Sequence, residues 1–376
     1  MDLIKERSNQ TLDIEAMHRA WLDLNFMEGL SVDKINKHKD QLKQLGAYPT
    51  MDYYYMDREQ RMNDETKRAC ILYEYLSNKG VLQDRTHVLS LALAPHYFGL
   101  AYQSFFFHFD GFVKTIQLLG DEEQIRKWVP KSYAFQVIGC YAQTELGHGS
   151  DVRNLETTAT YDKDTEEFIL NSPTTSSIKF WAGGLGKMAN HAIVQAQTSF
   201  GVQTFIVQIR DDDHLPVDNV HVGDVGTKFS FNSTDNGFLK FNNLRIPREN
   251  MLSKYTKITP KGEVTMADPK AVRLGYGNML FLRVWFYYFR CMSLSKLATI
   301  AIRYSIVRKQ FKNAETGEER QILDYQTQQY RLFPILGVSY AICLSSQNLI
   351  RMYTKYEKEL KEGNEPFDLL RQIHAL

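Results

Sequence analysis

The chain has 376 residues, with 45 Lys and Arg against 44 Asp and Glu, so its formal net charge is +1. This length predicts two or three domains with sizeable cores, and the balanced charge argues against a dedicated nucleic-acid binder. Hydrophobic residues make up 43% of the chain and charged residues 24%, which is typical of a folded globular protein and not of a disordered one.

The cysteines are widely spaced and include no CxxC pair: Cys70, Cys140, Cys291 and Cys343. This spacing suits neither a disulfide framework nor a zinc site, so we expect four buried thiols, a reducing compartment and no metal. The N-terminus lacks the apolar segment of a secretory signal. The most apolar stretch, 279–289, is interrupted by Arg283 and is shorter than the about 20 residues of a membrane span, which predicts a buried helix instead.

Helical patterns fill the chain up to about Tyr133. The first apolar positions near helical spacing are Ala16, Trp21, Leu24 and Met27. Residues 89–112 are rich in Phe, Tyr, Leu and Ala, which is typical of a buried helix. Asp121 and Gln124 predict a capped helix start, and Pro130 is expected to mark the end of that helix.

From about 135 to 273 the patterns are those of β-strands. Four strand-like runs come first, at 157–161, 168–170, 193–197 and 204–209. The triplet Asp235-Asn236-Gly237, between the runs 228–231 and 238–241, predicts a β-hairpin. We expect a compact, antiparallel, barrel-like β domain.

Helices return from Tyr276 onward. Residues 279–309 can form one long helix without Pro or Gly, and 321–361 a second that Pro334 is expected to kink. A third helix is expected from Phe367. The sequence therefore predicts a multidomain α+β fold with an N-terminal helical domain, a central β domain and an incomplete C-terminal helical bundle, at 1–134, 135–275 and 276–376.

The densest polar cluster is 140–151, at the junction of the helical and β patterns, where cofactors commonly bind. Its two glycines, its hydroxyl side chains and its backbone N–H groups suit a polar ring edge and a phosphate. A tight loop capped by its own polar side chains is the alternative, and composition does not decide between them. The GxGxxA run at 184–189 is not expected to bind a dinucleotide, because a strand and not a helix should follow it.

Several runs resemble peroxisomal acyl-CoA oxidases: 141–150 (YAQTELGHGS), 155–161, 168–173, 178–187 (IKFWAGGLGK), 276–277, 301–305, 308–310 and 326–330. The resemblance extends over most of the chain, so it is more specific than any single motif. These oxidases belong with the acyl-CoA dehydrogenases, and the resemblance implies their shared order of a helical, a β and a second helical domain.

The resemblance implies an FAD site formed by Tyr141, Ala142, Gln143, Thr144, Gly149, Ser150, Trp181, Gly183, Arg308, Gln328 and Gln329. The first pair of polar residues, Gln143 and Thr144, would hydrogen-bond the edge of the flavin ring. Gly149 and Ser150 would lie near the pyrophosphate or ribityl chain. Trp181 would border the isoalloxazine, as a flat aromatic against a flat aromatic, and ordinary packing in the β core is its alternative role.

Two further contacts are implied in the C-terminal helices. Arg308 matches the family arginine that reaches the FAD phosphates across a dimer interface, a role that suits a permanent charge with a planar fork. Tyr276 and Arg283 fall where the family contacts acyl-CoA. Because a cation on an apolar helix face needs a partner, an internal salt bridge is the alternative for Arg283.

The implied reaction is the α,β-dehydrogenation of a fatty acyl-CoA to a trans-2-enoyl-CoA in the peroxisome, with electrons passed to O₂ to give hydrogen peroxide. The partner would be a second copy or a related oxidase. The family's catalytic Glu falls beyond Leu376, nothing suggests that Glu145 replaces it, and the last three residues are not a peroxisomal signal. We therefore name no catalytic residue. A catalytically silent short form that dimerises with a full-length oxidase, and a dehydrogenase with a protein electron acceptor, stay open as alternatives.

Overall fold

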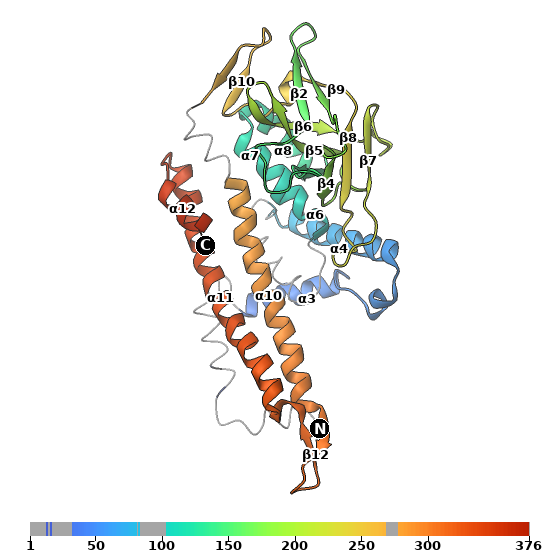
Figure 1. Ribbon diagram of the computed structural model, residues 1–376, viewed down its shortest axis with the longest axis vertical. Helices are drawn as coiled ribbons and strands as arrows, with labels where there is room; N and C mark the ends of the chain where they lie inside the picture. Colours follow the sequence, from blue (N-terminus) through green and yellow to red (C-terminus); the bar gives the residue numbers. More distant parts are fainter. Residues whose placement is uncertain are drawn as a thin grey trace. The chain divides into compact units, whose positions relative to one another are not determined.

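The computed structural model describes residues 32–80, 103–267 and 277–375, together with positions 13, 16 and 82 (Figure 1). These residues divide into two compact units, each assembled from separate segments of the chain. The β unit holds 49–70, 103–267 and 277–279, and the helical unit holds 32–48, 71–80 and 280–375. The apolar positions Trp21, Leu24 and Met27 and the first part of the expected helix 89–112 lie outside the described residues.

The short helix η3 (Arg248–Asn250) lies among the strands of the β unit, and the other helices of this unit precede them. The preceding helices are η1 (Met51–Tyr55), the first part of α4 (Arg58–Asn78), α6 (Gln103–Phe106), the π-helix η2 (Phe107–Val113), α7 (Lys114–Leu119) and α8 (Glu122–Tyr133). The predicted start of α8 is confirmed, because Asp121 and Gln124 form a capping box. The expectation that Pro130 ends α8 is wrong. Pro130 lacks only its own N–H donor, and its carbonyl still accepts the Ala134 N–H, so the helix continues to Tyr133.

The strands of the β unit form two main sheets and a small hairpin. The larger sheet contains β1 (Gly139–Ala142), β2 (Thr158–Asp162), β3 (Glu167–Asn171), β5 (His191–Thr198), β6 (Gly201–Gln208) and β9 (Leu244–Pro247). The smaller sheet contains β4 (Lys179–Ala182), β7 (Val220–Asp224) and β8 (Gly237–Phe241), and the hairpin pairs β10 (Thr256–Ile258) with β11 (Val264–Met266). The β domain is therefore confirmed, although β1 and β5 run parallel and the larger sheet is mixed.

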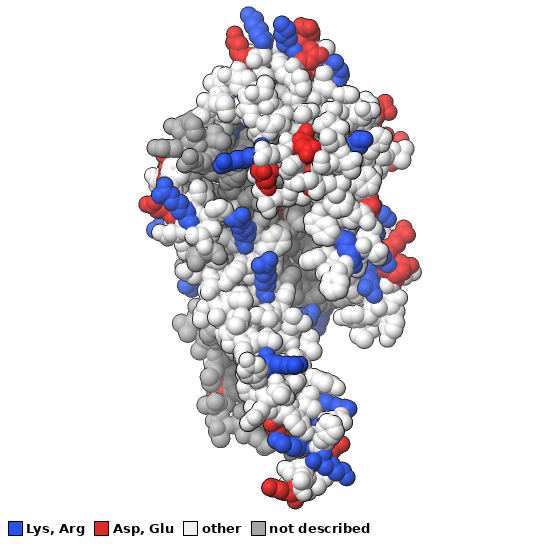
Figure 2. All heavy atoms as spheres, viewed as in Figure 1, with Lys and Arg blue, Asp and Glu red and all other residues white. Residues whose placement is uncertain are grey.

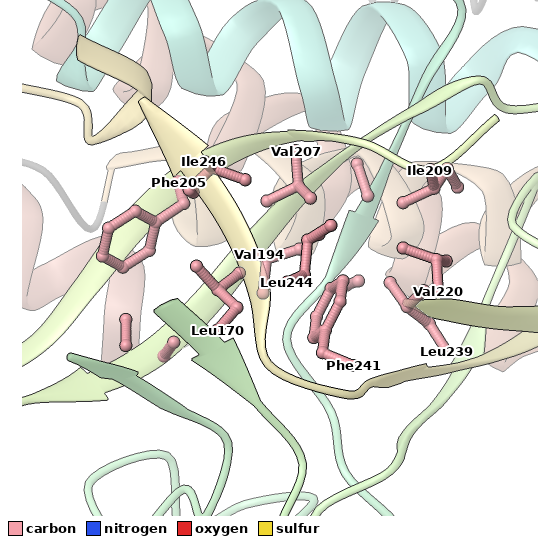
Figure 3. Close-up of a cluster of buried hydrophobic side chains, with 14 of the residues drawn as sticks. Leu170, Val194, Phe205, Val207, Ile209, Val220, Leu239, Phe241, Leu244 and Ile246 are labelled. Carbon is pink, nitrogen blue, oxygen red and sulfur yellow. The ribbon is translucent and has the colours of Figure 1, made fainter. Parts of the chain in front are cut away.

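Both sheets contribute to one apolar core, and Figure 3 shows their side chains meeting there. The larger sheet contributes Leu170, Val194, Phe205, Val207, Leu244 and Ile246, and the smaller contributes Val220, Leu239 and Phe241. Burying each large side chain contributes about 1.5–3 kcal/mol. The core therefore supports the loops at the ends of β1 and β4 on rigid strands.

The hairpin expected at Asp235-Asn236-Gly237 is wrong, because 228–231 is not a strand and β8 pairs with β7 and β4. The polar side chains of this triplet bind distant backbone instead of closing a local turn. The buried Asp235 carboxylate accepts the N–H groups of Lys187 and Met188, each at 2.8 Å. Tertiary hydrogen bonds thus override the local turn preference.

The helical unit consists of α3 (Val32–Gln44), the end of α4, α10 (Gly277–Val307), the hairpin β12 (Lys309–Lys312) and β13 (Glu319–Gln321), η4 (Ile322–Asp324), α11 (Gln326–Lys361) and α12 (Phe367–Ala375). The long helices α10 and α11 lie side by side and antiparallel (Figure 1). The hydroxyls of Ser295 and Ser339 are 2.9 Å apart between them, and the rings of Phe281 and Tyr353 have centroids 5.6 Å apart. The three helices expected after Tyr276 are confirmed.

The apolar stretch 279–289 lies in α10, where Leu280, Phe281 and Trp285 are buried, as expected. Within the described residues, the helix that is long and apolar enough to cross a membrane is instead α11, over Gln326–Leu360, with a mean hydropathy of 1.3. Length and composition alone do not show a membrane span, because helices of soluble proteins meet the same criterion.

The cysteines differ from the expectation of four buried thiols. Cys140 and Cys291 are buried, whereas Cys70 is exposed and Cys343 is half-buried. Cys343 lies on α11, and its thiol hydrogen-bonds with that of Cys291 on α10. Among the described residues, no group of three or more His, Cys, Asp or Glu side chains could hold a metal ion.

Candidate functional site

The loop 143–150 follows β1 and is only partly satisfied by protein hydrogen bonds. The N–H groups of 145–148 bond to carbonyls within the loop and at 176 and 178. Within the part of the chain that the structure describes, the loop N–H groups without a protein acceptor are those of Gln143, Thr144, Gly149 and Ser150. Free backbone donors gathered in one loop form a site for an acceptor group or an anion.

The side chains at the start of this loop differ in their roles. The Tyr141 hydroxyl donates to Gln143 Oε1 at 2.9 Å and accepts from Gln195 Nε2 at 3.4 Å. The hydrogen bond from Tyr141 fixes the orientation of the Gln143 side-chain amide, and the amide nitrogen is left available to a ligand. Ala142 is buried in the core, whereas the Thr144 side chain is exposed. Ala142 can therefore contribute only its backbone to a site, and Thr144 can contribute its hydroxyl.

Trp181 lies at the end of β4, at an irregularity in the pairing of β4 with β8. Its φ of 77° is in the left-handed region, which a bulky residue rarely adopts. Its side chain is 54% exposed, so it does not belong to the β core. Asn236 Nδ2 donates to the Trp181 carbonyl at 2.7 Å and stabilises this conformation. A strained residue that exposes a large aromatic ring is characteristic of a ligand site.

Gly183, two residues further on, is buried against the π-helix η2. A Cβ at this position would lie 2.6 Å from the Phe107 ring, so only glycine fits. Gly139, at the start of β1, is more restricted, because its Cβ would lie 2.0 Å from the Phe112 ring of the same helix. Phe107 and Phe112 thus determine how closely β1 and the segment after β4 pack against η2.

A pocket of about 440 Å³ opens beside Tyr141 and Gln143 in the β unit. Its wall combines apolar residues with neutral polar groups and Arg153. The Gln197 side chain lines it, and the buried Gln197 Oε1 has no hydrogen-bond partner among the described residues. The pocket therefore adjoins the free donors of the loop and offers both apolar surface and polar groups to a ligand.

Glu145 is unsuited to acid–base chemistry. Its side chain is fully buried, and Oε1 lies 2.9 Å from Lys179 Nζ. Burial acts to raise the pKa of Glu145, but the Lys179 charge and hydrogen bonds from Thr157 and the Glu156 N–H hold it below the usual range. The carboxylate is therefore ionised, paired and shielded from any ligand.

The remaining candidate residues belong to the helical unit. Arg308 is exposed and donates to Gln310 Oε1 at 2.9 Å, and Gln328 Nε2 donates to Ser305 Oγ at 3.1 Å. Gln329 is half-buried on the first turn of α11. Arg308, Gln328 and Gln329 thus lie at the end of the α10–α11 pair that is joined by the β12–β13 hairpin.

Arg283 lies on the exposed side of α10, with one guanidinium nitrogen 2.6 Å from His374 Nδ1. Since arginine has no acceptor, its guanidinium is the donor in this contact. Arg283 therefore does not interrupt the buried face, and its partner in the structure is not an acid. Tyr276 lies outside the described residues.

The structure thus places the predicted site residues of 141–150 in the same β unit as Trp181 and Gly183. The sequence interpretation missed Lys179 and Asn236. A lysine between Ile178 and Phe180 in a strand pattern could have indicated a buried, paired charge. No local signal identifies Asn236, because its triplet has the composition of an ordinary turn.

Three family models match the chain in order along its length. "Acyl-coenzyme A oxidase N-terminal" matches residues 31–138, "Acyl-CoA dehydrogenase, middle domain" matches 140–244, and "Acyl-CoA oxidase, C-alpha1 domain" matches 276–376. Peroxisomal acyl-coenzyme A oxidase 1 of Rattus norvegicus is 42% identical over 335 residues, which are 86% of this chain and 49% of the relative. The Cavia porcellus protein of the same name is 38% identical over 388 residues, 100% of this chain and 56% of the relative.

Solved structures agree with these matches. Acyl-CoA oxidase 1 of Arabidopsis thaliana has a TM-score of 0.85 at 36% identity, over 99% of this chain and 56% of that chain. Acyl-CoA oxidase-2 of Caenorhabditis elegans, solved bound with FAD, ascaroside-CoA and ATP, has a TM-score of 0.81 at 36% identity, over 91% of this chain and 52% of that chain. The chain spans about half the length of the relatives it matches.

Proposed function

We propose that this chain, which belongs to the acyl-CoA oxidase family, binds FAD and forms the flavin-binding part of an oxidase that acts on fatty acyl-CoA in the peroxisome. The observation that carries the proposal is the loop 143–150. Its free backbone N–H groups lie in the same unit as an exposed, strained Trp181. A flat aromatic ring system with a polar edge and an attached phosphate is the ligand chemistry that this combination suits.

The fit to FAD can be stated residue by residue. Gln143 and Thr144 would donate to the polar edge of the flavin ring, and Trp181 would cover its face. Gly149 has open space where a Cβ would point, so its N–H and that of Ser150 can approach a phosphate closely. When bound, FAD supplies the hydride acceptor of the reaction, and the protein supplies binding, orientation and polarity.

We propose that Arg308, Gln328 and Gln329 contact the FAD of a second copy or of a related oxidase. Arg308 is exposed, and its planar, permanently charged fork suits phosphate. Gln328 and Gln329 lie on the adjoining turn of α11. Their distance in sequence from the loop 143–150 is then explained by binding across a dimer.

For the substrate, we propose that the pocket beside Tyr141 and Gln143 receives part of the acyl-CoA. Tyr276 and Arg283 are proposed as further contacts. The overall change removes two hydrogens from the α and β carbons to give a trans-2-enoyl-CoA, and two electrons and two protons convert O₂ to hydrogen peroxide. No described residue is assigned as the base that removes the α-proton, because the buried Glu145 is fully occupied by Lys179 and Thr157.

The test is to purify the chain, add FAD, and measure retained flavin, followed by hydrogen peroxide release and O₂ uptake on addition of a fatty acyl-CoA. We expect retained flavin. A folded chain that retains none contradicts the proposal. Reduction of a protein electron acceptor without O₂ uptake would instead identify a dehydrogenase.

A further inference from the structure

Beneath the loop 143–150 lies a buried ion pair that no part of the proposed reaction uses. Lys179 Nζ is 2.9 Å from Glu145 Oε1, and both side chains are fully shielded from solvent. The same ammonium donates to the Gln143 carbonyl at 3.1 Å. Lys179 therefore contacts both the residue that starts the loop and the carboxylate inside it.

The Glu145 carboxylate has further partners on its other side. Its Oε2 accepts the Glu156 N–H at 2.8 Å, and its Oε1 accepts the Thr157 N–H at 2.9 Å and the Thr157 hydroxyl at 2.6 Å. Thr157 is fully buried and immediately precedes β2. The pair thus ties the loop to the larger sheet through Glu145 and to β4 through Lys179.

Backbone hydrogen bonds fix the register at the same place. The Phe180 N–H donates to the Thr144 carbonyl at 2.9 Å, and the Leu146 N–H donates to the Ile178 carbonyl at 3.0 Å. Residues 145 and 179 face each other as an antiparallel bridge. Two residues after Lys179, the same strand presents Trp181. A shift of the loop against β4 would therefore change the position of Gln143 and Thr144 relative to Trp181.

Two buried charges are costly to remove from water, and a well-packed apolar pair is often as stable. Burial lowers the pKa of Lys179 to about 8, and the Glu145 charge only partly offsets this effect. Overall stability is thus a weak reason for the pair. The geometry gives a better reason, because the ammonium and carboxylate bond to each other and make directional bonds to two backbone segments, at 143 and at 156–157.

We propose that Glu145 and Lys179 are positioning residues for the flavin, which hold the Gln143 and Thr144 donors at a fixed distance from Trp181. This inference rests on the proposed FAD binding, but its structural part does not need FAD. Both side chains are fully buried, so they would not contact the flavin directly. They act through the loop and through β4.

The test uses the double variant Glu145→Gln/Lys179→Met, which removes both charges and leaves one amide oxygen as the acceptor for the Thr157 N–H and hydroxyl. Arg245→Met is the control, because it breaks an exposed ion pair with Asp162 and Glu167 in the same unit. The measurements are the FAD dissociation constant and the amide hydrogen exchange of the flavin-free chain. The single variant Lys179→Arg keeps the positive charge beside Glu145. Its affinity for FAD should lie between that of the double variant and that of the unmodified chain.

We expect the double variant to fold cooperatively, to exchange the Leu146 and Gly147 amides faster, and to bind FAD about tenfold or more weakly. The control should match the unmodified chain in both measurements. Unchanged exchange and affinity in the double variant would overturn the inference. If the double variant does not fold, Thr157→Val takes its place. This substitution removes the hydroxyl bond to Glu145, and it should also speed amide exchange and weaken FAD binding, but by less.

The two proposals fail in different ways. If the unmodified chain binds no FAD, the proposed function fails, and the exchange of the Leu146 and Gly147 amides still decides whether the ion pair positions the loop. If the unmodified chain binds FAD and the variants bind it equally well, only the positioning role is wrong.

Discussion

Trp181 combines an unfavourable backbone conformation with an exposed indole ring, and neither feature contributes to folding. Its φ is 77°, and a bulky residue in that region costs about 1–3 kcal/mol. Asn236 offsets part of this cost by donating to the Trp181 carbonyl. The proposed contact between the Trp181 ring and a ligand would explain why this strained conformation is kept.

Replacing Trp181 with glycine separates these two effects. Because glycine adopts positive φ freely and the lost ring is 54% exposed, we expect Trp181→Gly to leave the free energy of unfolding unchanged or to raise it by about 1 kcal/mol. Affinity for FAD should fall. Chemical denaturation and flavin titration measure the two outcomes. A loss of stability of more than about 2 kcal/mol would show that the ring packs in the core after all.

His108 is a buried histidine whose tautomer is set by its neighbours. Its Nε2 lies 3.1 Å from the Ser132 carbonyl and therefore carries the proton, and its Nδ1 accepts the Gly139 N–H at 3.0 Å. Burial lowers the pKa of His108 to about 4. Protonation would place a hydrogen on Nδ1, against the Gly139 N–H at the start of β1.

This arrangement predicts a loss of stability in acid. Between pH 6.5 and 4 the unfolded chain binds the proton and the folded chain does not, so the contribution of His108 is complete above pH 6.5 and declines as the pH falls. The decline reaches about 3 kcal/mol near pH 4. His108→Gln, which can keep both hydrogen bonds, should show a flatter pH dependence of the free energy of unfolding. Parallel curves for the two proteins would refute this assignment.

At the scale of elements, the π-helix η2 determines where β1 and the segment after β4 lie. π-helical turns are frequent at functional sites. Here η2 packs Phe112 against Gly139 and Phe107 against Gly183. A side chain at either glycine would push the site segments away from the helix.

We therefore expect Gly139→Ala to lower the free energy of unfolding by about 2–3 kcal/mol, because the new Cβ overlaps the Phe112 ring. Gly149→Ala is the matched control, since a Cβ at that position would meet nothing within 4 Å, and its effect should stay within about 0.5 kcal/mol. Thermal or chemical denaturation compares them. Equal effects of the two substitutions would show that the close packing at Gly139 is not required.

The sequence predicts an element well when residues within that element determine it, and poorly when contacts with distant segments do. The capping box of α8 and the long helix α10 were predictable, because capping residues and an apolar run without Pro or Gly act within one element. The conformation of Asp235 and Asn236 was not predictable, because both side chains bind backbone that is remote in the sequence. The local signal indicated a hairpin there instead. The candidate site loop 143–150 was predicted from its composition and from the family resemblance, and its role as a site stays a prediction. The Glu145–Lys179 pair was not predicted, because it forms only when the strands assemble.

At the scale of the whole molecule, α10 and α11 expose both apolar and cationic surface. α10 contains no Asp or Glu, and the first acid in α11 is Glu357. Figure 2 shows Lys and Arg side chains over these helices with few acids between them. The most exposed apolar residues of the pair are Leu297, Ile300, Tyr304 and Tyr330. This surface fits the proposed contact with a second chain and with phosphate. The segments 1–134, 135–275 and 276–376 remain our proposed domain boundaries.

If Arg308 binds the FAD of a partner chain, its effect must depend on association. We expect Arg308→Glu to weaken FAD binding at protein concentrations where the chain is dimeric, and to leave it unchanged where the chain is monomeric. Sedimentation combined with flavin titration measures this. A loss of affinity that is the same at all concentrations would place Arg308 at the flavin of its own chain.

The central claim, that the loop 143–150 binds FAD through its free backbone donors, is tested most directly by amide hydrogen exchange with and without FAD. The account predicts one bound FAD per chain and new protection at four amides, those of Gln143, Thr144, Gly149 and Ser150, which lack protein acceptors among the described residues. FAD binding that leaves these four amides unprotected, or no binding by the folded chain, would contradict it.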